Sequence, residues 1–243
     1  MISLAASTLP FSASAQGTFQ NLDFESANLS PVPPNQNIVE VSTASALPGW
    51  TTYLGTVQQT QVIQNSYGEG EAEIDVFGPN YPAAGPSHGL IPGTIDGNYS
   101  VLLQSGGEPG NSIVPIGASI TQTGVVPSGA QSMQFKAWQT YFTAFTVSFN
   151  GTALSPVVLA AGPNYTLYGV NISPYDGQSG PLEFTADFSG TGASWLGLDD
   201  IVFSPAAVPE PSPILLTGVG GLMLGVYRRF RQRHQANPTG YAD

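Results

Sequence analysis

Apolar and polar residues alternate with a period of two through much of the chain. The alternation is clearest in the runs 116–120, 133–137, 145–149 and 182–188. Because successive side chains of a strand point to opposite faces, this pattern predicts half-buried β-strands. Asn150-Gly151 follows one of these runs and is typical of a hairpin turn.

No helical periodicity interrupts this pattern between residues 18 and 205. Glycine and proline separate the runs at short intervals, and residues 78–98 hold five glycines and four prolines, which predicts a long loop. We therefore expect an all-β sandwich over residues 16–205, a length that can bury one substantial core.

Composition narrows the possible functions. Only 9% of residues are charged, against roughly 25% in ordinary soluble domains. Residues 16–205 hold 14 acids and one lysine, a net charge of 1 − 14 = −13. Such a body cannot neutralise a phosphate backbone, which excludes nucleic-acid binding. The chain has no cysteine and two histidines, which excludes disulfides and thiol nucleophiles and argues against zinc.

The N-terminus resembles the end of a secretory signal peptide. Ala13-Ser14-Ala15 has the small-residue pattern of a cleavage site, although the preceding apolar stretch is short and no basic residue precedes it. We expect residues 1–15 to be the remnant of a signal peptide that starts upstream of Met1. A flexible N-terminus is the alternative.

The C-terminus has the features of a membrane anchor. A proline-rich stem over residues 206–213 precedes an uncharged stretch, residues 214–227. Fourteen residues span about 21 Å as a helix, less than the bilayer core of about 30 Å, so length alone favours a buried helix or an interfacial segment. Tyr227 and the following arginines can extend the effective span by lying at the headgroups. We expect a single short transmembrane helix and a cytoplasmic tail, residues 228–243, held there by Arg228, Arg229, Arg231 and Arg233.

The order of Pro209-Glu210-Pro211, short apolar helix and arginine cluster resembles the PEP-CTERM sorting signal of Gram-negative bacteria. The resemblance implies recognition by an exosortase, a membrane-embedded transpeptidase, and delivery to the cell surface or the exopolysaccharide matrix. The sorting motif would comprise Val208, Pro209, Glu210, Pro211 and Ser212. An ordinary anchor with a proline-rich stem is the alternative.

A second resemblance concerns the body of the chain. The opening Asn21-Leu22-Asp23-Phe24-Glu25, the closing Asp199-Asp200-Ile201 and Pro48-Gly49-Trp50 are similar to motifs of galactose-binding-like jelly rolls, which include carbohydrate-binding modules. The resemblance implies a jelly-roll sandwich whose first and last strands lie close together. It also implies a structural calcium ion held by Glu25 and by Asp199 or Asp200, and calcium prefers such hard oxygen ligands. Two exposed aspartates at a strand edge are the alternative.

Aromatic residues are candidates for sugar stacking in such a fold. The candidate carbohydrate-binding residues are Trp50, Tyr53, Trp138 and Tyr141, with Phe142 and Trp195 as further rings. For each ring separately, packing in a core is the favoured interpretation.

Glu69, Glu71, Glu73 and Asp75 share one parity and would face one side of a strand. A solvent-exposed face or a charged sheet edge is the favoured interpretation. A glycosidase acid and nucleophile about 5 Å apart is the alternative.

Together these patterns predict an exported surface protein that is not an enzyme and that associates with exopolysaccharide. The expected partners are an exosortase, the membrane and the polysaccharide. A carboxylate-dependent glycosidase and a purely structural surface protein are the alternatives.

Overall fold

The computed structural model describes residues 18–32, 39–65, 71–79, 93–141, 144–188, 190 and 192–209. The chain divides into two compact units, residues 1–208 and 209–243. Only Pro209 of the second unit is described, and the fold is therefore that of the first unit. The predicted signal-peptide remnant, the helix over 214–227 and the arginine cluster lie outside the described residues. Within the described part, no helix is long and apolar enough to span a membrane.

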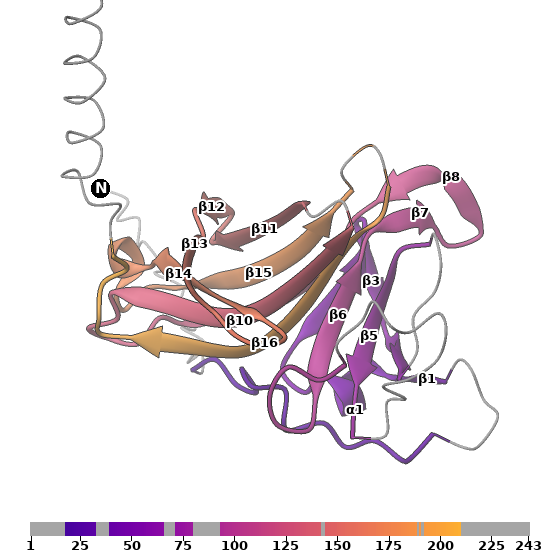
Figure 1. Cartoon of the computed structure of the whole chain (residues 1–243), viewed down its shortest axis with the longest axis horizontal. Coiled ribbons are helices and arrows are strands. Elements are labelled where there is room, and N and C mark those ends of the chain that lie inside the picture. Colours follow the sequence, from indigo (N-terminus) through magenta and orange to yellow (C-terminus); the bar gives the residue numbers. More distant parts are fainter. Residues whose placement is uncertain are drawn as a thin grey trace, which may run out of the picture. The chain divides into compact units, whose positions relative to one another are not determined.

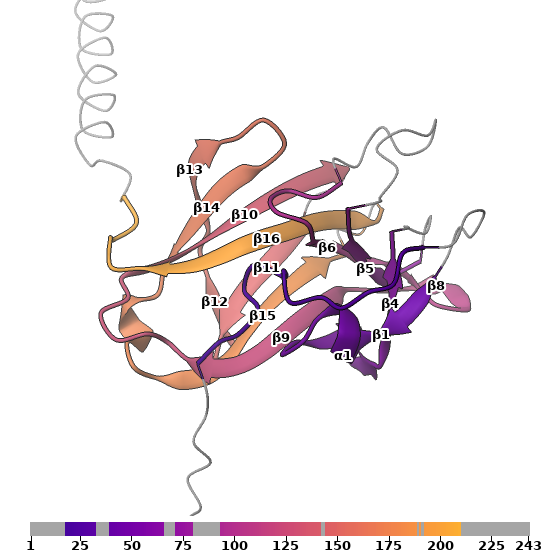
Figure 2. The same cartoon turned by 90° about the horizontal axis from the view of Figure 1, so that it is seen from below.

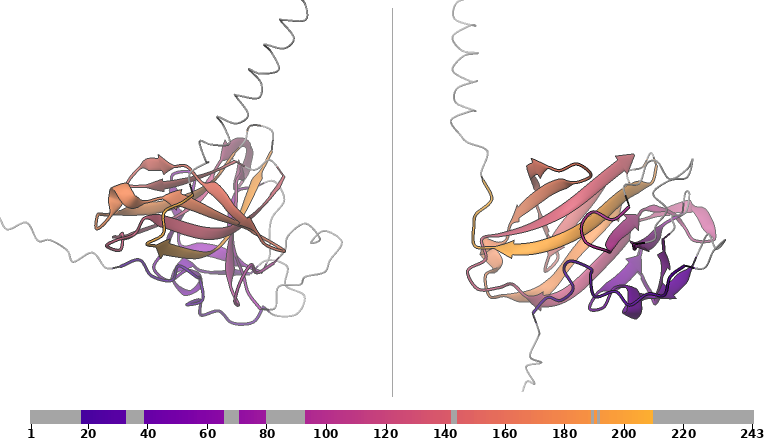
Figure 3. Two further views of the ribbon diagram at one scale, coloured as in Figure 1. Left: turned by 60° about the vertical axis from the view of Figure 1, so that its left-hand side comes forward. Right: turned by 60° about the horizontal axis from the view of Figure 1, so that its bottom comes forward.

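The first unit is built from two β-sheets and a hairpin (Figures 1, 2 and 3). The first sheet has eight strands in the order β1 (Glu40–Ser42), β4 (Gln61–Gln64), β5 (Glu73–Phe77), β6 (Ser100–Gln104), β16 (Ser194–Ser204), β10 (Ser132–Tyr141), β14 (Thr166–Asn171) and β13 (Val157–Ala161). The second has six, in the order β12 (Thr152–Leu154), β11 (Ala144–Phe149), β15 (Ser179–Asp187), β9 (Ala118–Val125), β2 (Thr51–Leu54) and β3 (Val57–Gln59). The hairpin joins β7 (Gly106–Glu108) to β8 (Asn111–Ile116).

Helical structure is minor in the described residues. α1 (Thr43–Ala46) is one turn, capped by the Ser42 side chain, and a 3-10 turn, η1, covers Ser173–Tyr175. The all-β prediction is therefore confirmed, and the sheets are arranged as in a sandwich. The predicted strands correspond to β10, β11 and β15 and to the end of β8 with the start of β9. Asn150 and Gly151 form the β11–β12 turn with φ of 50° and 74°, the left-handed region that such a turn requires.

The main core fills the space between the sheets. Phe135 of β10 and Phe184 of β15 lie edge to face, with ring centroids 5.2 Å apart, and both are fully buried. The alternation in β10 and β15 directs one set of side chains into this space and the other set away from it. Apolar burial of this kind is the dominant stabilising contribution to the fold.

A second, smaller hydrophobic cluster lies on the other face of the eight-stranded sheet, which we call the outer face. It consists of Phe77, Ile95, Leu102, Trp138 and Trp195. Leu102 alternates with Val101 and Leu103, which pack in the main core, and this alternation identifies the opposite face. Both faces of the central strands are therefore buried.

Candidate functional site

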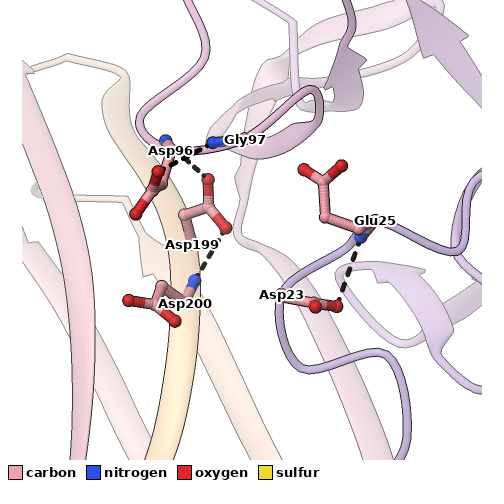
Figure 4. Close-up of a pocket in the computed structure, with 6 residues that line it drawn as sticks. All are labelled: Asp23, Glu25, Asp96, Gly97, Asp199 and Asp200. Atoms are coloured by element: carbon pink, nitrogen blue, oxygen red, sulfur yellow. Dashed lines mark hydrogen bonds between the residues drawn. The ribbon is translucent and has the colours of Figure 1, made fainter.

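Carboxylates gather where the N-terminal segment, the loop 93–99 and β16 meet. They line a pocket of about 210 Å³, which we call the closure pocket and which is formed by Asp23, Glu25, Asp96, Gly97, Asp199 and Asp200 (Figure 4). The start and the end of the sandwich are joined beside it, because the Ile201 N–H donates to the Leu22 carbonyl at 2.9 Å. The two ends of the domain thus lie side by side, as the resemblance to jelly rolls implied.

Glu25 holds the loop 93–99 by its side chain. Its Oε1 accepts the N–H groups of Asn98 at 2.7 Å and Tyr99 at 2.9 Å, and its Oε2 accepts the Asn98 side-chain amide at 3.0 Å. The loop approaches so closely that a Cβ on Gly97 would lie 2.3 Å from Oε1, and Gly97 also has a positive φ of 57°. Only glycine fits this position without strain.

Asp199 is buried and fully engaged in hydrogen bonds. Its Oδ2 accepts the Ser100 hydroxyl at 2.6 Å and the Asp96 N–H at 3.1 Å, and its Oδ1 accepts the Asp200 N–H at 2.7 Å. Burial raises the pKa of Asp199 to about 7, and the hydrogen bond from Ser100 opposes that rise.

Asp200 is the extra residue of a β-bulge. Gln134 pairs with Val202 and Lys136 with Asp199, so two residues of β16 face one residue of β10. Asp200 takes a positive φ of 48° at this point. The bulge shifts the alternation of side chains between the two faces of the sheet. Asp199 faces the outer face, whereas Ile201, two residues later, packs in the main core. As a result, the carboxylates of both Asp199 and Asp200 line the closure pocket.

Lys136 supplies the positive charge. Its Nζ lies 2.8 Å from Asp200 Oδ2 and forms a second ion pair with Asp96 Oδ2. The same ammonium lies 5.3 Å from the centroid of the Tyr165 ring. Hydrogen bonds to Asp200 and then to Asp96 raise the pKa of Lys136 above its usual range. The bond from Lys136 lowers the pKa of Asp96. The local sequence does not connect Lys136 with these acids, because the link depends on strand register.

These contacts bear on the calcium site implied by the jelly-roll resemblance. Among the described residues, no group of three or more histidine, cysteine or acidic side chains could hold a metal ion. Both oxygens of Glu25 and of Asp199 already accept hydrogen bonds, and an ammonium group lies between Asp96 and Asp200. Calcium coordinates six to eight oxygen ligands. In this arrangement the donor set does not fit a calcium ion.

The structure contradicts the favoured interpretation of the acidic run 69–75, which was a solvent-exposed face or a charged sheet edge. β5 lies inside the sheet between β4 and β6, and Glu73 and Asp75 are buried, with exposed fractions of 8% and 0%. The interpretation as a solvent face or sheet edge is therefore wrong for these two residues. Burial, followed by the charge of Glu73 and a side-chain hydrogen bond with Glu73, raises the pKa of Asp75 well above its usual value. Glu71 is exposed, and Glu69 lies outside the described residues.

The candidate sugar-stacking rings do not share one surface. Trp50 is 5% exposed, packs in the main core against Phe24 and donates its Nε1–H to the Asn21 carbonyl at 3.0 Å. Trp138 is also 5% exposed and lies on Gly197, where a Cβ would meet the indole at 2.2 Å. Both indoles are core side chains, because no broad ring face is left for a sugar. Tyr53 is half-buried on β2, and the Tyr141 side chain is not described.

A second depression, the edge groove, lies between the edges of the two sheets. Its volume is about 470 Å³, and its lining consists of Glu40, Leu54, Gln59, Gln61, Val62, Ile63, Glu71, Ala72, Glu73, Ile74 and Pro109. Three carboxylates, two amides and six apolar residues therefore share its lining. The acidic run had singled out Glu71 and Glu73 in the sequence. No local sequence pattern identifies Gln59 and Gln61 as residues of this groove.

Of the sorting motif, Val208 and Pro209 are described, whereas Glu210, Pro211 and Ser212 are not. The four arginines are likewise outside the described residues, so the sorting signal stays a prediction.

Comparison with known proteins adds little to this geometry. No family model matches the chain, and no curated protein matches it. Among solved structures, the enzymatically active domain of tailspike protein 4 of bacteriophage CBA120 is similar at a TM-score of 0.36 and 16% identity. The match covers 68% of this chain and 21% of that one, so the chain corresponds to about a fifth of the tailspike chain.

Proposed function

We propose that this protein is an exported surface protein without enzymatic activity, whose β-sandwich binds uncharged exopolysaccharide through the edge groove. The sorting-signal pattern at residues 208–233 supports delivery to the outside by an exosortase. The observation that carries the binding role is the lining of the groove, which combines amides and carboxylates with apolar residues.

The groove chemistry suits a polyhydroxylated ligand. Carboxylates accept hydrogen bonds from hydroxyls, the Gln59 and Gln61 amides both donate and accept, and aliphatic side chains contact the apolar face of a sugar ring. The volume of about 470 Å³ is within the range of small-ligand sites.

Electrostatics favours an uncharged ligand. Lys136 is the only lysine or arginine before Arg228, and its ammonium is paired with Asp96 and Asp200. A polyuronate would meet a body of charge −13 with no uncommitted ammonium or guanidinium group in its described part. A neutral glucan meets no such repulsion.

The test is retention of the full-length protein on immobilised neutral glucans and on polyuronates. We expect retention on a neutral polysaccharide, and binding about tenfold weaker in Gln61→Ala, because one hydrogen bond to the ligand is lost. Gln131→Ala, at an exposed glutamine outside the groove, is the matched control. Flat results across all glycans would instead favour a purely structural surface protein, and preferential polyuronate binding would contradict the electrostatic argument.

The glycosidase alternative rests on Glu73 and Asp75. The raised pKa of Asp75 is a shift in the direction that a general acid needs. Its side chain is fully buried, however, so a sugar cannot reach it in this arrangement, and we rank the binding role first. Polysaccharide turnover that disappears in Glu73→Gln would reverse this order.

A further inference from the structure

We propose that the Lys136 ammonium is a built-in cation that closes this sandwich in place of a divalent metal ion. The jelly-roll resemblance implies a structural calcium ion at the junction of the first and last segments. The contacts in the closure pocket assign that neutralising role to a side chain of the protein.

The junction concentrates negative charge. Five carboxylates line the closure pocket, two of them adjacent in β16. Like charges so close together destabilise the folded state unless a cation or hydrogen-bond donors compensate for them. Hydrogen-bond donors reach Glu25 and Asp199, and the Glu25 N–H donates to Asp23 at 3.3 Å, which leaves Asp96 and Asp200 as the pair that needs a cation.

Lys136 reaches both remaining carboxylates from β10. It pairs with Asp199 across the β10–β16 register, and the bulge at Asp200 directs the next carboxylate to the same side. Asp96 approaches from the loop 93–99, so one ammonium joins β10, β16 and this loop. The Lys136 side chain is 16% exposed, against 59% for Asp96 and 38% for Asp200, so the ammonium is the best shielded member of the group.

The ammonium also excludes a divalent ion from the junction. An ammonium and a divalent cation repel each other, and Lys136 already contacts two of the oxygens that such an ion would use. The junction therefore stays closed without metal, and its stability depends on the lysine charge.

The first experiment measures the melting temperature (Tm) of the full-length protein in a chelator and in millimolar calcium chloride. We expect the same Tm in both, and no heat of calcium binding by titration calorimetry. A Tm that falls in the chelator, or a measurable heat of calcium binding, would overturn the proposal.

The second experiment removes the charge and keeps the alkyl stem. Lys136→Met should lower the Tm by roughly 2–8 °C, because two carboxylates lose their cation. Lys136→Arg, which keeps the charge, should retain most of the stability. An unchanged Tm in Lys136→Met would overturn the proposal.

A charge-removal rescue separates a neutralising role from simple packing. Adding Asp96→Asn and Asp200→Asn to Lys136→Met removes the uncompensated carboxylates, and we expect this triple variant to regain most of the lost Tm. The triple variant also tests the proposal if Lys136→Met alone does not fold. A triple variant no more stable than Lys136→Met, or one that does not fold, would show that uncompensated carboxylate charge is not the cause of the loss and would sink the proposal.

Discussion

The Nζ atom of Lys136 lies 2.8 Å from Oδ2 of Asp200, and this contact exists because Asp200 is the extra residue of a bulge. In a regular strand, Asp199 and Asp200 would point to opposite faces. The positive φ of Asp200 brings both carboxylates to the closure pocket instead.

The first prediction follows from this backbone conformation of Asp200. Asparagine tolerates a positive φ, whereas a β-branched residue does not. We expect Asp200→Val to lower the free energy of unfolding by about 1–3 kcal/mol more than Asp200→Asn, measured by urea denaturation. Since both variants lose the same charge, equal losses would mean that the strained conformation does not contribute.

The second prediction concerns pH and Asp75. Its pKa is raised above the ordinary value of 3.8 by burial, so between 3.8 and the raised pKa the folded protein holds a proton that the unfolded chain has released. The contribution of Asp75 to stability is therefore fully present below pH 3.8 and is lost as the pH rises through the folded-state pKa, at up to about 1.4 kcal/mol per pH unit.

Replacement by asparagine removes this titration. We expect the free energy of unfolding of Asp75→Asn to fall less steeply with rising pH than that of the wild type, measured by denaturant titration at successive pH values. Glu108→Gln, at an exposed carboxylate on β7, serves as the control. Parallel pH profiles for the wild type and Asp75→Asn would rule out the raised pKa.

The third prediction concerns the contact between Trp138 and Gly197. A Cβ on Gly197 would lie 2.2 Å from the indole, so Gly197→Ala must displace a buried ring. We expect a loss of about 1–3 kcal/mol by urea denaturation and a changed near-ultraviolet circular dichroism spectrum. In a Trp138→Leu background the same alanine should cost much less, and an equal cost in both backgrounds would place the cause elsewhere.

The fourth prediction concerns the loop held by Glu25. Glu25→Gln keeps the size of the side chain but removes the charge that strengthens the hydrogen bonds from Asn98 and Tyr99. Hydrogen exchange at these two amides should quicken about tenfold, while exchange in β15 stays unchanged. Glu40→Gln, an exposed position away from this loop, is the control. Unchanged exchange at Asn98 and Tyr99 would contradict the role of Glu25 in holding the loop 93–99.

The fifth prediction concerns export. Deletion of residues 208–233 removes the predicted sorting signal, and we expect the protein to be absent from the cell surface, measured by surface labelling and fractionation. Replacement of the arginines alone, Arg228 to Arg233, should leave the Pro-Glu-Pro motif intact and alter membrane orientation. Surface delivery that survives the deletion would refute the sorting hypothesis.

Much of the fold could be predicted from local sequence. The alternation of apolar and polar residues in 133–137, 145–149 and 182–188 predicts β10, β11 and β15. Asn150-Gly151 predicts the hairpin turn after β11. Both the period of a strand and the residues of a tight turn are local properties of the sequence. The jelly-roll resemblance, which rests on motifs around Glu25 and Asp199, also implied that the two ends of the domain meet.

The remainder depends on non-local pairing. β5 pairs in parallel with β4 and antiparallel with β6, which makes it an interior strand, and the parity of Glu73 and Asp75 gives no sign of this. Lys136 was visible as a lone cation, but its partners follow from the β10–β16 register and from one bulge. Such features arise from tertiary packing and not from a local pattern.

The position of Lys136 also affects how the protein withstands proteolysis. Trypsin-like proteases cut after lysine or arginine, and residues 1–227 offer them only the bond that follows Lys136. That bond lies within β10, hydrogen-bonded between β14 and β16, so the folded domain gives such a protease no accessible substrate. Even when transiently unfolded, residues 1–227 would be cut only once, and the domain is therefore inherently resistant to this class of protease.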